Sequence, residues 1–134
     1  WDELFARIDS PNFKLAFDPS HFVWQMMDPY KAVRDYGSRI AHVHAKDTEI
    51  LWDELQRTGI LFCPKYVEDS SEGWWRYRVP GLGQIDWKKL IDRLREAGFD
   101  GTISIEHEDP IWSGSQEKVK EGLVRGLRHI QSCL

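Results

Sequence analysis

Several features that mark other classes of protein are missing from this 134-residue sequence. It has no run of lysine and arginine, and its formal net charge of −4 argues against a nucleic-acid partner. No apolar run approaches the roughly 18 residues that a membrane helix needs, and no signal-peptide pattern opens the chain. We therefore expect a cytoplasmic protein that binds neither nucleic acid nor a membrane.

Cysteine is also scarce. Cys63 and Cys133 lie far apart in the sequence and fit neither a zinc-binding pair nor a disulfide framework, which agrees with a reducing compartment. The length suits one domain, and 41% hydrophobic with 30% charged residues is typical of a soluble globular protein. No sequence repeat of 20–50 residues is evident.

Short strands alternate with helices along the chain. Apolar residues at helical spacing, together with N-cap and Gly signals, predict helices over 1–8, 29–36 and 87–97. A capping box of Ser113 and Gln116 predicts a last helix with a buried stripe. The stripe consists of Val119, Leu123, Leu127 and Ile130. Strands are predicted at 13–17, from 40 onward and at 102–105. Such alternation predicts a parallel sheet with helices outside it.

The segment after the second strand has no clear period. Residues 49–75 read as irregular, although 50–57 could form a helix and 69–73 is a polar turn. Long connections at the carboxyl end of a parallel strand often carry active-site loops, but a surface excursion without a role is the alternative. The run Trp74–Tyr77 would expose much apolar area unless it covers something, which favours the functional alternative.

Polar side chains follow all three predicted strands. Asp18 and His21 follow the first, His44 lies at the end of the second, and Glu106 follows the third. Because the carboxyl ends of parallel strands share one rim, these residues should converge. Aspartate, histidine and glutamate together suit Mn²⁺, Co²⁺, Mg²⁺ or Zn²⁺. The sequence thus predicts one divalent-metal site, although each residue alone could merely cap a strand or helix.

Four motifs resemble, in order and spacing, the carboxy-terminal half of the xylose isomerase-like TIM-barrel family. They are Phe17–His21, His42–Asp47, Val79–Trp87 and Gly98–Glu106. The resemblance implies an α/β fold, a parallel (β/α) barrel of TIM type with only the last three or so β-α units present. Residues 1–134 would form this C-terminal part, with a long loop at 48–78 over the active-site rim. A complete barrel needs about 250 residues, so a missing barrel half or a homo-oligomer partner is expected.

The resemblance also assigns roles by position. It implies metal ligation by Asp18, His44 and Glu106, three of the family's four ligands, and no residue here matches the fourth, a glutamate. Glu106 and His21 would be catalytic. Contacts to a small-molecule sugar substrate would come from Arg78, or from Arg76 as the less favoured position, and from His21, Trp75 and Lys46. His42, Lys46 and Asp47 would orient His44 and set the local charge.

The family contains sugar and sugar-phosphate isomerases and epimerases, inosose dehydratases and relatives of endonuclease IV. The leading hypothesis is therefore a divalent-metal-dependent isomerase or epimerase that acts through an enediolate, with Glu106 moving the proton. A dehydratase or lyase acting on a keto-inositol or keto-glycoside is the second hypothesis, and a non-catalytic metal- or carbohydrate-binding partial barrel is the third. An endonuclease IV-like three-zinc site is disfavoured, because no histidine lies between Asp47 and Glu106.

Overall fold

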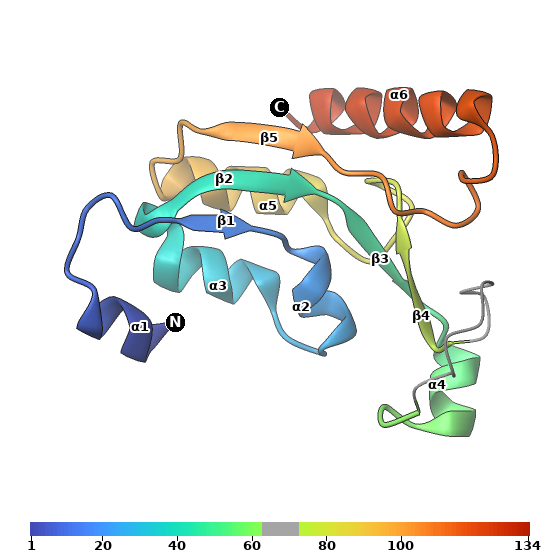
Figure 1. Cartoon of the computed structure of the whole chain (residues 1–134), viewed down its shortest axis with the longest axis horizontal. Helices are drawn as coiled ribbons and strands as arrows, with labels where there is room; N and C mark the ends of the chain where they lie inside the picture. Colours follow the sequence, from blue (N-terminus) through green and yellow to red (C-terminus); the bar gives the residue numbers. More distant parts are fainter. Residues whose placement is uncertain (63–72) are drawn as a thin grey trace.

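The computed structural model describes residues 1–62 and 73–134, and three parallel strands form its centre (Figure 1). The strands are β1 (Leu15–Phe17), β2 (Ile40–Ala45) and β5 (Thr102–Ile105), in the order β1-β2-β5. Val43 of β2 is paired with Phe17 on one side and Ile103 on the other. All three strands point the same way, so their carboxyl ends form one rim, as the alternating pattern predicted.

Helices connect these strands, and those at 29–36 and 87–96 lie where local signals predict them. They are α1 (Asp2–Arg7), α2 (Ser20–Trp24), α3 (Pro29–Tyr36), the 3₁₀ helix η1 (Gly37–Arg39), α4 (Trp52–Thr58), α5 (Trp87–Glu96) and α6 (Gln116–Cys133). Asp28 caps α3 and Asp86 caps α5, each by accepting backbone N–H groups of the first turn. Within the described residues, none of the helices has both the length and the apolar character needed to cross a bilayer.

The hydrophobic core lies between β2 and the apolar faces of α3 and α5. Val43 and Val33 are fully buried, as are Leu90 and Leu94 of α5. Burying each such side chain stabilises the fold by about 1.5–3 kcal/mol. The helical stripe predicted for residues 87–97 therefore anchors the strand that carries His44.

The last helix begins later than predicted. Ser115, not Ser113, is the N-cap, because its hydroxyl oxygen accepts the N–H of Lys118 at 3.2 Å. The Ser113 hydroxyl instead donates to the carbonyl oxygen of Asp109 at 2.8 Å. The prediction of a capping box at Ser113 and Gln116 was wrong, since residues 113–115 are needed to complete the preceding loop.

Of the stripe predicted for α6, Ile130 is buried as expected, but the rest of the buried face differs. Its buried residues are Gly122, Gly126, Ile130 and Cys133, whereas Leu127 is 46% exposed. A β-carbon at Gly126 would lie 3.0 Å from Pro80 Cδ, so the helix packs through close backbone approach. An apolar-period search overlooks glycine, which explains the error.

Residues 48–78 contain more regular structure than the sequence indicated. β3 (Asp47–Ile50) follows β2 almost directly and pairs antiparallel with β4 (Trp75–Arg78). This ladder extends beyond the tips of the parallel strands, and α4 lies at its far end (Figure 1). The polar turn predicted at 69–73 falls mostly within 63–72, outside the described residues.

A buried carboxylate holds the glycine-rich turn after β4 against β3. Asp47 is fully buried, and its oxygens accept the N–H groups of Gly81 at 3.0 Å and Ile85 at 3.1 Å and the indole N–H of Trp87 at 3.0 Å. A β-carbon at Gly83 would lie 2.3 Å from Asp47 Oδ1, so the turn requires glycine there. The predicted role of Asp47 in orienting His44 is thus replaced by a structural one.

Candidate metal centre

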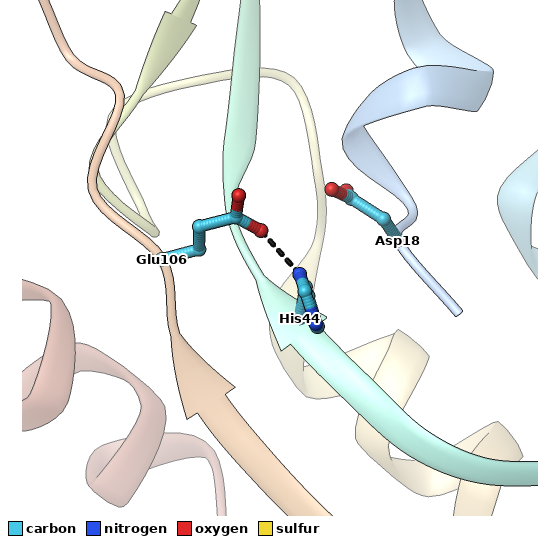
Figure 2. Close-up of side chains that lie close together, drawn as sticks. All are labelled: Asp18, His44 and Glu106. Atoms are coloured by element: carbon cyan, nitrogen blue, oxygen red, sulfur yellow. Dashed lines mark hydrogen bonds and ion pairs between the residues drawn. The ribbon is translucent and has the colours of Figure 1, made fainter. Parts of the chain in front are cut away.

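The three predicted metal ligands meet at the rim of the parallel sheet (Figure 2). Asp18 follows β1, His44 lies in β2 and Glu106 follows β5, and one ligand atom from each lies within 4.8 Å of the other two. The strand register produces this convergence, because Phe17 is paired with Val43 and Ala45 with Ile105. Asp18 and His44 therefore lie at the same level, and Glu106 lies two residues beyond Ser104, the partner of His44 in β5.

Asp18 has one oxygen engaged locally and the other directed to the cluster. Its Oδ1 accepts the N–H of Ser20 at 2.9 Å and the Ser20 hydroxyl at 2.5 Å, which fixes the start of α2. Its Oδ2 faces Lys46 and His21. The turn-forming role and the ligand role, which the sequence presents as alternatives, are thus compatible in one carboxylate.

Glu106 and His44 contact each other directly. His44 Nδ1 and Glu106 Oε2 form a hydrogen bond, and both side chains are about one-third exposed. Burial raises the pKa of Glu106, but the hydrogen bond with His44 and the charge of Lys46 outweigh it, so the net shift of the pKa is downward. Glu106 is therefore a carboxylate near neutral pH, able to bind a cation or accept a proton.

Lys46 places a positive charge beside the three candidate ligands. Its side chain is only 3% exposed, and Nζ lies 2.7 Å from Glu108, 3.1 Å from Asp18 and 3.3 Å from Glu106. Burial by itself would lower the pKa of Lys46, but the hydrogen bonds to Glu108 and Asp18 raise the pKa by more. The net shift is therefore upward, and the group stays charged. The substrate contact expected of Lys46 stays a prediction; the described contact is with carboxylates.

His42 and Arg78, two further residues expected near the centre, have different partners. The His42 ring packs edge-on against the His44 ring, with centroids 5.1 Å apart. Arg78 of β4 donates through Nε to Asp109 Oδ2 at 2.8 Å and through Nη1 to Glu49. Two of its three guanidinium nitrogens are therefore engaged, and its role in substrate binding stays a prediction, as does that of Arg76.

Trp75 of β4 is one of three aromatic side chains that pack together beside His21, the others being Trp24 and Tyr77. It stacks on Trp24 of α2, with centroids 5.1 Å apart and planes 12° from parallel. The hydroxyl of Tyr77 lies 3.0 Å from His21 Nδ1. Sequence reasoning included Trp75 and Tyr77 but missed Trp24, although its position three residues after His21 in a helix places both on one face.

A divalent metal fits this donor set. Two carboxylates and one imidazole from neighbouring strands suit the harder divalent ions, and their spacing allows all three to reach one ion. Across residues 1–62 and 73–134, this is the one group of three or more such side chains that lie this close together.

Parallel β-α units that carry a candidate metal centre at the carboxyl rim are typical of one class of protein. This class is the (β/α) barrels, whose active sites lie at that rim. The family model that matches residues 1–133 is described as "Xylose isomerase-like TIM barrel". The chain belongs to this family and forms part of such a barrel, which confirms the resemblance and the fold class expected from the sequence.

Relatives show how much of the barrel is present. Inosose dehydratase of Lacticaseibacillus casei is 33% identical over 110 residues, which cover 81% of this chain and 35% of that protein. Inosose dehydratase of Clostridium tetani is 30% identical over 131 residues, or 97% of this chain and 41% of that protein. The uncharacterised protein YfiH of Bacillus subtilis is 38% identical over 101 residues, or 74% of this chain and 32% of that protein. The chain thus spans between about one-third and two-fifths of their lengths.

A solved structure supports the fold independently. The xylose isomerase domain protein from Planctomyces limnophilus superposes with a TM-score of 0.70 at 21% identity. The match covers 98% of this chain and 41% of that chain. It supports the assignment of the three parallel strands to one side of a larger barrel.

Proposed function

We propose that this chain supplies the metal-binding part of an enzyme that removes the proton next to the carbonyl of a keto sugar or keto polyol. The convergence of Asp18, His44 and Glu106 carries the proposal, because it brings together three candidate ligands, and one of them, Glu106, is a carboxylate that can take up a proton. The family and the relatives named inosose dehydratase support a carbohydrate-directed reaction.

Each residue of the site has a chemical task in this proposal. Asp18, His44 and Glu106 would hold one divalent metal, which supplies Lewis-acid polarisation of the carbonyl and the adjacent hydroxyl. Glu106 accepts the α-proton from the substrate carbon. His21 donates a hydrogen bond to a substrate oxygen, and the ring face of Trp75 that is not stacked on Trp24 covers the apolar face of the sugar.

The names of the relatives favour dehydration over isomerisation. In dehydration, Glu106 takes the α-proton and then gives it to the hydroxyl on the next carbon, which leaves as water while a carbon–carbon double bond forms. In isomerisation or epimerisation, no group leaves, and a proton is returned to the same or the neighbouring carbon. Both reactions begin with the same proton transfer, so the residues of this chain serve either.

The experiment uses the protein with a complete barrel, stripped of metal and then supplied separately with Mn²⁺, Co²⁺, Mg²⁺ and Zn²⁺. Inosose and a keto sugar are incubated in D₂O and followed by proton NMR and ultraviolet absorbance. Loss of water from inosose, with a product that absorbs in the ultraviolet, supports dehydration. Deuterium incorporation or carbonyl migration without loss of water supports an isomerase or epimerase. Stoichiometric metal binding without either reaction contradicts the proposed activity and favours a non-catalytic binding protein.

The remaining strands of the barrel form part of the proposal. We expect them to come from the rest of a longer protein or from a second copy, and to supply a further carboxylate to the centre. β1 and β5 are the edge strands of the described parallel sheet, so both ends of the sheet can accept a further strand. Size-exclusion chromatography with light scattering and a metal assay on the same fractions would show which source completes the site.

A further inference from the structure

Two side chains from different elements reach the same nitrogen of His21. The indole Nε1 of Trp24, in α2, lies 3.3 Å from His21 Nδ1. The hydroxyl of Tyr77, in β4, lies 3.0 Å from that nitrogen. On the other side of the ring, His21 Nε2 lies 3.3 Å from Asp18 Oδ2.

The chemistry of these partners fixes which nitrogen carries the proton. An indole N–H can only donate a hydrogen bond, so it needs a lone pair on His21 Nδ1. An ionised carboxylate can only accept, so Asp18 needs a hydrogen on His21 Nε2. The two sides of the ring therefore require the same tautomer, and the Tyr77 hydroxyl can adapt to it by sharing the Nδ1 lone pair with Trp24 as a second donor.

We infer that Trp24 and Tyr77 are positioning residues that hold His21 as the Nε2–H tautomer, with this N–H directed toward the metal cluster. In that state His21 can donate a hydrogen bond to a substrate oxygen near Asp18. This use of the N–H rests on the proposed function, whereas the tautomer itself does not.

Packing holds both positioning residues in place. Trp24 is stacked against Trp75, whose strand also carries Tyr77. The ammonium of Lys46 lies 4.4 Å from the centre of the Tyr77 ring. Burial raises the pKa of Tyr77, which keeps its hydroxyl protonated and able to donate. The β3–β4 ladder thus orients a residue of α2 across the centre, a role that the sequence did not indicate.

The tautomer can be read directly by NMR. The complete protein, labelled with ¹⁵N-histidine, is measured at mildly alkaline pH as wild type, Trp24→Phe, Tyr77→Phe and the double variant. For wild type we expect a protonated-type Nε2 and an unprotonated-type Nδ1 resonance for His21. In the double variant the Nδ1 resonance should move toward that of a nitrogen without a hydrogen-bond donor. Trp52→Phe is the matched control, because Trp52 is exposed in α4 and should leave the His21 signals unchanged.

Kinetics then connect the tautomer to catalysis. Loss of both hydrogen bonds should lower kcat/KM by roughly five- to tenfold per bond, while the circular dichroism of the double variant stays that of wild type. His21→Gln, which keeps an amide N–H near the Nε2 position, should retain more activity than His21→Asn. A wild-type His21 that carries its proton on Nδ1 would overturn the inference even if the enzyme dehydrates inosose. A correct tautomer in a protein with no carbohydrate activity would leave the inference intact and refute the proposed function alone.

Discussion

The acidic side chains of the β3–β4 ladder and those of the parallel-sheet rim are engaged in different ways. Asp47 and Asp109, which hold the ladder in place, are fully buried and accept mainly backbone N–H groups. Asp18 and Glu106, at the rim, are 12% and 33% exposed, and their cluster-facing oxygens contact the side chains of Lys46, His21 and His44.

This difference separates fold-forming from ligand-binding carboxylates. Backbone N–H groups cannot leave without unfolding a turn, so Asp47 and Asp109 are committed to structure. The contacts of Asp18 and Glu106 with Lys46 are made by a side chain, so a cation can replace them without unfolding a turn. The type of hydrogen-bond partner therefore distinguishes the two groups better than burial alone does.

The largest effect is expected for Glu106→Gln in the complete enzyme. The amide can neither accept the α-proton nor supply a charged ligand, so kcat should fall by about 10²–10⁴-fold. Turnover is measured at saturating substrate and metal. Glu117→Gln, at an exposed position of α6, is the matched control and should retain full activity. A Glu106→Gln enzyme with a near-normal rate would remove Glu106 from the chemistry.

Asp47→Asn should damage the fold rather than the metal cluster. Its amide group would place N–H donors against the donors of Gly81, Ile85 and Trp87, which should cost about 2–4 kcal/mol in the free energy of unfolding. Urea denaturation measures this cost. Asp53→Asn, in exposed α4, should change the free energy by less than about 0.5 kcal/mol. A stable Asp47→Asn protein would contradict the distinction between the two groups.

Asp18→Asn should weaken metal binding rather than damage the fold. The amide keeps the contact with Ser20 through its oxygen but loses the charge that faces the cluster, so metal affinity should fall by more than the ~10- to 100-fold that loss of an outer-shell partner costs. Equilibrium dialysis with Mn²⁺ or Zn²⁺ measures the affinity, with Asp53→Asn again as the control. Unchanged affinity in the Asp18 variant would exclude Asp18 as a ligand.

Acid should weaken the ladder through Asp109. Burial raises the pKa of Asp109, but the Arg78 guanidinium and the N–H groups of Val79 and Ile111 outweigh it, so the folded pKa lies below the ordinary value. Its stabilisation is therefore fully present above the unfolded pKa of about 3.9 and is lost as pH falls through the lower folded pKa. Unfolding free energies measured from neutral pH downward should fall less steeply below about pH 4 in Asp109→Asn than in wild type. Parallel curves for the two proteins would show that Asp109 does not supply this pH dependence.

The smallest expected effect concerns the start of α6. Ser115→Ala should lower the free energy of unfolding by about 1 kcal/mol, because the N–H of Lys118 loses its cap. Ser113→Ala removes only a hydroxyl that donates to a loop carbonyl and should leave the helix content unchanged. Circular dichroism and urea denaturation of both variants would decide between the two serines. A larger loss of helix in Ser113→Ala would instead support the capping box that the sequence predicts at Ser113 and Gln116.

The sequence predicted those parts of the fold that depend on neighbouring residues. Asp28 and Asp86 cap helices as expected, and β5 occupies the predicted residues 102–105. The convergence of Asp18, His44 and Glu106 was also predictable, since parallel strands bring their carboxyl ends to one rim whatever the details of packing.

Only the tertiary structure decided which partners these residues meet. The pairing of β3 with β4 and the attachment of Asp47 to the turn at Gly81 join segments separated by more than twenty residues, a distance over which local spacing carries no signal. The same holds for Tyr77 and His21 across the centre. Local backbone preferences and apolar periods thus determined the three parallel strands, the caps of α3 and α5 and the polar residues that follow the strands. Long-range packing alone determined which carboxylates are fixed by backbone N–H groups and which remain available to a ligand.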